Sequence, residues 1–528
     1  MKLAEVSQKA YRIKLLMEYC RKSSVHGVTY WSDPHRPYWE RFLWMILILV
    51  SLVMSGRMIR CSWEKWSGHA LAFTLGSHAI HISEIPFPAF TVCSMARFRN
   101  DLVNYTEAIT EYRTKGIMPS DLEDFDGVSQ TCANSPPAEM FPKINSKNIY
   151  ETLRRNQLDP EAMFAICNFV LENNSCSSYY QEVFTRHGRC YTFNGLNRHQ
   201  IFRPGSIVPD DFESSTTPSN WTVSRGYLGL HEIYPLRAFQ VMPFYGFTLR
   251  MRFNVTDGDM LCFPMGIGAI VQLHEPSEAP FMVERYRAIT LEHYGRVVVR
   301  PEMITTAPEL ARYSPHERLC FFPGEKYLQH FSIYNSRNCR VECIANLTLE
   351  KCGCVFFHMP HNESVKICGR GSVPCYQMVL RNLDRAILRN AGVENLSSCD
   401  CLPSCTSINY KFDLIQHKMF LWEKNRSQVN EVLIRIYFQR NTFIPFQRSE
   451  LYGLTEFLAS CGGILGLFMG VSVLSLAELF YFFPIRYLWN RSLEKSMAGQ
   501  KVRPNVEYPR MIAVSPKTHV KIFVRPRF

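Results

Sequence analysis

Two long apolar segments, one near each end of the 528-residue chain, most constrain how it can fold. Residues 42–56 contain no charged side chain, and neither do residues 457–477. The second segment matches the roughly 20 apolar residues that a helix needs to cross the hydrocarbon core of a bilayer. The first reaches that length if the long side chain of Arg57 extends to the interface. We therefore expect two transmembrane helices, with both chain ends on one side and the long middle segment on the other.

The charged residues near the two ends indicate the orientation. Residues 1–41 carry eight Lys and Arg against four Asp and Glu, and residues 484–528 carry ten against two. These two ends account for the whole formal net charge of +12. Because positively charged flanks stay in the cytoplasm, we expect a plasma-membrane protein with both termini cytoplasmic. No nucleic-acid partner is expected, since no basic patch alternates with aromatic residues.

The expected layout has five parts. Residues 1–40 form a cytoplasmic segment, 41–60 the first transmembrane helix and 61–451 the extracellular domain. Residues 452–483 form the second transmembrane helix, and 484–528 a basic cytoplasmic tail.

The middle segment has the features of a glycosylated extracellular domain. Eight of its asparagines begin Asn-X-Ser/Thr sequons, which are glycosylation acceptors in an exported domain: Asn104, Asn173, Asn220, Asn254, Asn346, Asn362, Asn395 and Asn425. Asn490 begins another, and on the cytoplasmic side it should stay unmodified.

The cysteines support the same compartment. Of the 19 cysteines, 16 fall in the extracellular domain once Cys20, Cys61 and Cys461 are set aside as cytosolic, membrane-edge and intramembrane. An exported domain oxidises its cysteines to disulfides. The Cys-X-Cys pairs at 352–354 and 399–401 also fit a zinc site, but the compartment argues against it. We expect disulfides, no metal and no cofactor.

The periodicity of the extracellular part is weak and favours a mixed α and β fold. Residues 296–300 and 432–438 are rich in β-branched and aromatic side chains and are expected to form strands. Residues 161–170 and 342–350 are expected to be helical. Residues 205–225 and 273–281, rich in Pro, Ser, Thr and Glu, are expected to be surface loops.

The second apolar segment contains the most distinctive pattern. Gly462, Gly466 and Gly470 are spaced four apart and so share one helix face. Such a face suits close packing against another helix. It equally suits an aqueous path, in which the chain breaks from helix to extended form across 470–472 and exposes backbone carbonyls. The pattern alone does not choose between these two interpretations.

Glu478 follows the same segment. A carboxylate inside a membrane usually faces water or a partner group, so three copies around an axis would form a cation-attracting ring. The alternative is a glutamate that reaches the cytoplasmic interface.

Several short motifs occur in a fixed order along the chain. They are His26-Gly27, Phe-Pro-Ala-Phe-Thr-Val-Cys at 87–93, Gly-Arg-Cys-Tyr-Thr-Phe-Asn at 188–194, Cys-Gly-Cys at 352–354 followed by His-Met-Pro at 358–360, Cys-Leu-Pro-Ser-Cys at 401–405 and Gly-Val-Ser at 470–472. Through them the chain resembles the degenerin and epithelial sodium channel superfamily, and most closely its insect pickpocket branch. The resemblance covers nearly the whole chain.

The resemblance implies an architecture and an activity. It implies an α+β membrane protein whose two transmembrane helices flank a disulfide-rich domain with palm, finger, thumb, knuckle and β-ball parts. It implies a homo- or heterotrimer with related channel subunits. The trimer would be a sodium-selective, voltage-independent, amiloride-sensitive cation channel and not an enzyme.

The resemblance also implies roles for residues of the second apolar segment. Gly470, Val471 and Ser472 would form the selectivity filter. Gly466 would lie near the amiloride site. Ala459 would hold the degenerin position, where a bulky side chain props the pore open.

Three further residues are expected to act in the inner pore and in gating. His26 and Gly27 would belong to a re-entrant cytoplasmic segment, and Glu478 would lie at the inner end of the pore.

The family's disulfide pattern, carried over by position, implies seven bridges. They are Cys93–Cys190, Cys167–Cys176, Cys320–Cys405, Cys339–Cys401, Cys343–Cys399, Cys352–Cys375 and Cys354–Cys368. Cys132 and Cys262 are left over and can pair with each other.

Other classes and the stimulus stay open at this point. An ATP-gated trimeric receptor and a two-pass surface receptor or ectoenzyme without a pore share the two crossings. No His-Glu-X-X-His or Gly-X-Ser-X-Gly motif occurs in the extracellular part, which disfavours common hydrolase chemistry. The acidic pocket of proton-sensing relatives has no match, so a mechanical, osmotic, chemical or peptide stimulus is equally open and the extracellular ligand is unknown.

Overall fold

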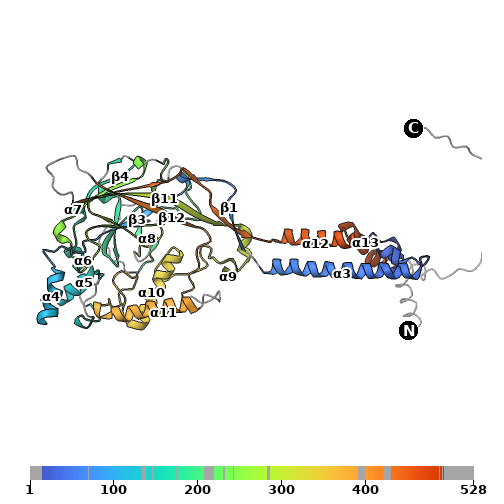
Figure 1. The fold of residues 1–528 in the computed structure, drawn as a ribbon, viewed down its shortest axis with the longest axis horizontal. Helices are drawn as coiled ribbons and strands as arrows, with labels where there is room; N and C mark the ends of the chain where they lie inside the picture. The colour runs from blue at the N-terminus through green and yellow to red at the C-terminus, as the bar shows by residue number, and fades with distance from the viewer. Residues whose placement is uncertain are drawn as a thin grey trace, which may run out of the picture. The chain divides into compact units, whose positions relative to one another are not determined.

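The fold is given by a computed structural model, shown in Figure 1. It describes residues 15–492 except 69–70, 134–137, 146–147, 171, 174, 207–218, 230–231, 242, 282–285, 390–398, 420–429, 487 and 490–491. The chain divides into two compact units. One is Leu71–Leu451, and the other combines Met1–Ala70 with Tyr452–Phe528.

The larger sheet of the unit Leu71–Leu451 is mixed. Among the described residues it has eight strands in the order β1-β15-β11-β13-β8-β4-β5, with β12 paired to β11. Most neighbours pair antiparallel, but β11 runs parallel to β13 and to β15. The strands are β1 Leu71–Leu75, β4 Phe164–Phe169, β5 Glu172–Asn173, β8 Phe247–Arg252, β11 His293–Thr306, β12 Ser407–Lys418, β13 Glu431–Phe438 and β15 Phe446–Glu450.

The second sheet of this unit is antiparallel, in the order β10-β9-β3-β7-β6. Its strands are β3 Ala89–Ser94, β6 Tyr180–Thr185, β7 Gly188–Phe193, β9 Gly268–His274 and β10 Arg287–Thr290. A two-stranded sheet joins β2 Ile80–His81 to β14 Thr442–Phe443.

The core lies between the two large sheets. In β3, Phe90 and Val92 alternate with Thr91 and Cys93, and all four are buried, so the strand is covered on both faces. The Phe90 ring stacks on Phe193 of β7 at 4.8 Å and meets Phe247 of the other sheet edge-on at 4.9 Å. Aromatic contacts of this kind join the two sheets.

Helices complete the unit Leu71–Leu451, and Figure 1 labels them. They are α4 Tyr105–Lys115, α5 Leu122–Ser129, α6 Ile149–Asn156, α7 Pro160–Met163, α8 Arg198–Ile201, α9 Pro315–Arg318, α10 Ser336–Cys352 and α11 Val373–Arg389. Gly353 ends α10 in the left-handed region at φ 72°, which explains the glycine between Cys352 and Cys354.

Eight disulfides hold this unit together. They are Cys93–Cys190, Cys132–Cys262, Cys167–Cys176, Cys320–Cys405, Cys339–Cys401, Cys343–Cys399, Cys352–Cys375 and Cys354–Cys368. Seven are the pairs that the resemblance implies, and the eighth joins the two cysteines left over. Cys20, Cys61 and Cys461 are free. This unit is therefore a disulfide-rich mixed α and β domain.

Two of the local predictions for this unit are wrong. Residues 161–170 were expected to be helical, but α7 ends at Met163 and β4 continues through Phe169. Pairing of β4 with β8 and the Cys167–Cys176 bridge override the local preference for helix. Residues 273–281 were expected to form a surface loop, yet Glu275 and Ser277 are buried.

Three other local predictions agree with the structure. Residues 342–350 lie in α10, and residues 296–300 and 432–438 lie in β11 and β13, so all three are confirmed. In the predicted loop 205–225, residues 207–218 lie outside the described residues.

The other unit is helical. It contains α2 Val28–Ser32, α3 Tyr38–Ser67, α12 Leu454–Met469, α13 Val473–Phe480 and a π-helical turn Tyr481–Ile485. α3 and α12 lie side by side (Figure 1) and are joined by a hydrogen bond between the hydroxyls of Ser62 and Ser460 at 3.1 Å. Within the described residues, α3 alone is long and apolar enough to cross a membrane as one helix. α12 and the helical segment after it meet the same test only as a bent pair.

Candidate functional site

The second apolar segment breaks after Met469. Gly470 adopts φ 66° and ψ 21°, in the left-handed region that favours glycine. Its N–H donates to the carbonyl of Gly466 at 2.9 Å, and the N–H of Val471 donates to the carbonyl of Leu465 at 3.3 Å. The helical segments on the two sides of the break differ in direction by 78°. The residues 470–472 thus form a turn between two helices, not part of one continuous helix.

Ser472 starts the second helix through a reciprocal cap. Its Oγ accepts from the N–H of Ser475 at 3.3 Å, and the Ser475 Oγ accepts from the N–H of Ser472 at 3.2 Å. Within the described part of the chain, no hydrogen bond reaches the carbonyl oxygen of Gly470 or Val471. Backbone oxygens left free in this way are able to coordinate a cation.

The His-Gly pair of the N-terminal segment lies against the break. The backbone N–H of His26 donates to the carbonyl of Met469 at 3.0 Å. The imidazole covers Gly470 so closely that a Cβ there would lie 2.6 Å from His26 Cε1. Gly27, at φ 85°, faces α3, where a Cβ would lie 3.1 Å from Ile48 Cγ1. The pair therefore fits between α3 and the break only because Gly27 and Gly470 lack side chains.

A second contact joins the N-terminal segment to α13. The Ser24 hydroxyl donates to the Glu478 carboxylate at 2.9 Å and also lies 2.8 Å from the Ser475 hydroxyl. Glu18 forms an ion pair with Arg486 at 3.0 Å. Glu478 is thus held by this segment. No local pattern indicated a role for Ser24, because the contact joins residues far apart in the chain.

The glycine face of α12 is not the face that packs on α3. The contacts to α3 are made by Phe457, which stacks on Trp66 at 5.2 Å, and by Ser460. Ala459 is exposed on α12. Around Gly462 and Gly463, nothing in the described residues comes within 4 Å of an added Cβ. The part of this face around Gly462 and Gly463 is therefore free in the single chain for a second copy or for water.

The sequon asparagines are at the surface where the structure describes their side chains. Five are exposed: Asn104, Asn220, Asn254, Asn346 and Asn362. Asn173 lies in β5, without a described side chain, and Asn395, Asn425 and Asn490 lie outside the described residues.

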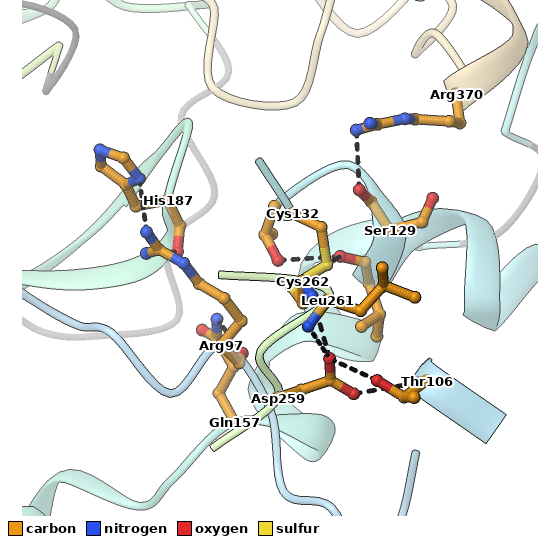
Figure 2. Close-up of a disulfide and its surroundings, with 12 residues drawn as sticks. Arg97, Thr106, Ser129, Cys132, Gln157, His187, Asp259, Leu261, Cys262 and Arg370 are labelled. Carbon is orange, nitrogen blue, oxygen red and sulfur yellow. Dashed lines mark hydrogen bonds between the residues drawn. A yellow bond between two sulfur atoms is a disulfide. The ribbon is translucent and has the colours of Figure 1, made fainter. Parts of the chain in front are cut away.

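Figure 2 shows the Cys132–Cys262 bridge, which joins the segment just after α5 to the turn that contains Leu261 and Cys262. The Asp259 carboxylate, just before Cys262, accepts from the N–H and the hydroxyl of Thr106 at 2.9 Å each. It also accepts from the N–H groups of Leu261 and Cys262 at 2.9 Å each. The start of α4 is thereby tied to the disulfide that follows α5.

A buried carboxylate connects α5 to the region of α11. Asp126 accepts from the N–H of Arg370 at 2.6 Å, from the Asn145 amide at 2.8 Å and from the Gln130 amide at 3.1 Å. Burial raises the pKa of Asp126 to about 6, although these hydrogen bonds act in the opposite direction. The sequence contained no signal for this network.

Two sequence motifs of the extracellular part have structural roles. Asn194 is the last residue of the motif at 188–194. Its amide donates to the carbonyl of Phe87 at 2.6 Å and accepts from the N–H of Leu236 at 2.6 Å. The motif at 87–93 leads into β3, which pairs with β7, so Cys93 lies opposite Cys190 and is bonded to it. Both motifs therefore contribute to the core.

Comparison with known proteins finds one matching family model, described as amiloride-sensitive sodium channel, over residues 19–482. The chain is 25% identical to pickpocket protein 28 of Drosophila melanogaster, over 90% of this chain and 79% of the relative. It is 20% identical to sodium channel protein Nach of Drosophila melanogaster, over 96% and 94%. It is 22% identical to acid-sensing ion channel 4-B of Danio rerio, over 92% and 79%.

Proposed function

The chain belongs to the amiloride-sensitive sodium channel family, and we propose that it is a pore-forming subunit of a sodium-selective, voltage-independent cation channel. Family membership confirms the resemblance on which the sequence interpretation rested. The family is one of membrane-embedded ion channels and not of enzymes. The break across residues 470–472 is the observation that best supports a pore-forming role for this chain.

We assign the selectivity filter to Gly470, Val471 and Ser472. Two points support this assignment. The carbonyls of Gly470 and Val471 have no hydrogen-bond donor among the described residues. Irregular backbone at membrane depth is tolerated only where it is buried in protein or lines water. A ring of such carbonyls from several subunits would replace part of the hydration shell of an ion.

We propose that the subunits assemble as a homo- or heterotrimer with related channel subunits. The open face at Ala459, Gly462 and Gly463 supports this, because small residues let helices from neighbouring copies approach the axis. We place Gly466, one turn before the filter, near the position where amiloride binds. Glu478, held by Ser24, would lie at the inner end of the path.

We propose a plasma-membrane location with two crossings and both termini cytoplasmic. The positive charge of both ends supports this orientation, and the exposed sequons support an extracellular unit Leu71–Leu451. The gate would then respond to a mechanical or chemical stimulus that acts on the extracellular domain.

Substitution of Ala459 tests the proposal without knowledge of the stimulus. Valine there should hold the pore open because the larger side chain cannot fit where the helices meet in the closed state. The measurement is whole-cell current in cells that express Ala459→Val, with sodium, potassium and amiloride exchanged in the bath. Leu467→Val, at an exposed and already bulky position of α12, serves as the matched control.

A constitutive, amiloride-sensitive sodium current with Ala459→Val and none with the control would support the proposal. A surface glycoprotein that gives no current alone or with related subunits would favour a two-pass receptor or ectoenzyme instead.

A further inference from the structure

A groove of about 640 Å³ is open at the surface of the unit Leu71–Leu451. One part of its lining is the first half of α4 with the residues just before that helix, and another is the segment 117–125. The last two residues of α6 complete it. Phe125 in the lining is buried and stacks on Tyr105 of α4 at 5.4 Å, so the groove lies above a packed core.

The groove exposes apolar side chains to solvent. Leu102 is 49% exposed, Ile117 50% and Met118 48%, and all three line it. Apolar side chains that gather in a surface groove usually mark a place where another group binds. The occupant should therefore have an apolar face.

The charged residues of the lining are mostly acidic. They are Glu107, Glu111, Asp121, Asp124 and Arg155, and the guanidinium of Arg155 pairs with Asp124. Ionised carboxylates only accept hydrogen bonds, and they repel an anionic ligand. The occupant should therefore supply several hydrogen-bond donors and carry no negative charge.

Asn104, which begins a sequon, is itself part of the lining. Its side-chain oxygen accepts from the N–H of Glu107 at 3.0 Å and caps α4. Its amide nitrogen, the atom that would carry a glycan, donates to the Glu107 carboxylate at 2.9 Å. Because Glu107 also lines the groove, this nitrogen faces the groove. A glycosylated amide keeps one N–H, which is enough for that contact.

The size and chemistry of the groove suit the first sugars of an N-linked glycan. An apolar cavity of about 150 Å³ holds benzene, with its six carbon atoms. At that density the groove takes about 25 non-hydrogen atoms, close to the two N-acetylglucosamine residues that begin such a glycan. Sugar rings combine C–H faces with hydroxyl donors, and they are uncharged.

Covalent attachment strengthens the case for a glycan over a free ligand. A tethered group has an effective concentration in the millimolar range, so weak contacts are enough to hold it in the groove. A free cationic peptide would also suit the carboxylates, but it would have to displace the tethered sugars.

We propose that the first sugars of a glycan on Asn104 occupy this groove, with their ring faces on Ile117 and Met118 and their hydroxyls on the carboxylates. The bound sugars would join the start of α4 to the segment that leads into α5. The inference rests on the proposed extracellular location of this unit and does not depend on channel activity.

Oxidation of Met118 by dilute hydrogen peroxide measures whether the groove is covered, because methionine in contact with solvent is converted to the sulfoxide. The sample is full-length glycoprotein in detergent, and mass spectrometry of its peptides reports both the sulfoxide and the glycan at each sequon. Met378 of α11, 45% exposed against 48% for Met118, serves as the internal reference.

Asn104→Ser removes the glycan and keeps the helix cap, because serine with Glu107 three residues later forms a capping box. Thr106 is left unchanged, since its hydroxyl binds Asp259 (Figure 2). Met118 should then be oxidised about tenfold faster, the ratio expected if the sugars fill the groove about nine tenths of the time. Asn362→Ser, which removes a different sequon, should leave the rate at Met118 unchanged.

An equal rate at Met118 in wild type and Asn104→Ser would overturn the proposal and leave the groove open to a free ligand such as a cationic peptide. A second measurement uses wild-type protein alone, from cells that make only short high-mannose glycans. Met118 should stay protected there because the core sugars are retained, and loss of protection would overturn the proposal. An unmodified Asn104 beside a glycosylated Asn362 would overturn this proposal alone, whereas unmodified asparagines at all sequons would also contradict the extracellular location.

Discussion

The contact between His26 and Gly470 provides a quantitative test of the site. Alanine at Gly470 meets two obstacles. The backbone is at φ 66°, where a side chain costs about 1–2 kcal/mol. The new methyl group would also lie 2.6 Å from His26 Cε1. The imidazole must then leave its rotamer, at a cost of about 0.5–1.5 kcal/mol.

These two contributions are separable by a second substitution. His26→Ala removes the ring, so the double variant His26→Ala/Gly470→Ala keeps only the backbone cost of about 1–2 kcal/mol. The coupling between the two positions should therefore be about 0.5–1.5 kcal/mol in the direction of rescue. Gly56→Ala in α3 is the matched control, because nothing in the described residues lies within 4 Å of its Cβ.

The assay is heating of detergent-extracted full-length protein followed by size-exclusion chromatography. We expect Gly470→Ala to melt well below wild type, the double variant to recover part of the loss, and Gly56→Ala to match or exceed wild type, since alanine favours a helix. If Gly470→Ala melts like Gly56→Ala, or if removal of His26 gives no recovery, the His26 ring does not lie on the break.

Three further predictions concern the unit Leu71–Leu451 and the topology. Replacing both Cys132 and Cys262 by serine should destabilise the domain by about 2–5 kcal/mol and speed limited proteolysis near α4, whereas Cys61→Ser, which removes a free exposed thiol, should not. The pKa of Asp126 is raised to about 6, so the folded state binds more protons than the unfolded state between about pH 4 and 6. Stability should fall as pH rises through that window and then level off. Asp126→Asn should flatten this part of a plot of melting temperature against pH. A plot that the substitution leaves unchanged would refute a raised pKa at Asp126. Asn104→Gln or Asn346→Gln should each increase gel mobility by one glycan, whereas Asn490→Gln should not, and a shift with Asn490→Gln would place the C-terminal tail outside the cell.

Much of the architecture could be predicted from the sequence, for identifiable physical reasons. The two apolar segments and the charge at the ends are local properties, so the helices α3 and α12 could be expected directly. The disulfides followed from the resemblance and not from the residues themselves, because a cysteine count cannot determine pairing. The glycine spacing suggested either close helix packing or a chain break at Gly470, and the structure contains the break.

The failures all involve long-range contacts. Residues 164–169 form a strand because β8 and Cys176 are available in the folded chain, not because of local preference. Glu275 is buried beside Ser277, whose carbonyl accepts from Asn338 of α10 at 3.1 Å, so a composition typical of a loop was misleading. The contact of Ser24 with Glu478 joins the N-terminal segment to α13, and no local pattern could have indicated it.

The most direct test of the central claim is the ion selectivity of the open pore. In cells that express Ala459→Val, replacing bath sodium by potassium should shift the reversal potential to more negative values. The shift should shrink when Ser472→Ala is added, because Ser472 ends the proposed filter and positions α13. A reversal potential that Ser472→Ala leaves unchanged would contradict a filter at residues 470–472.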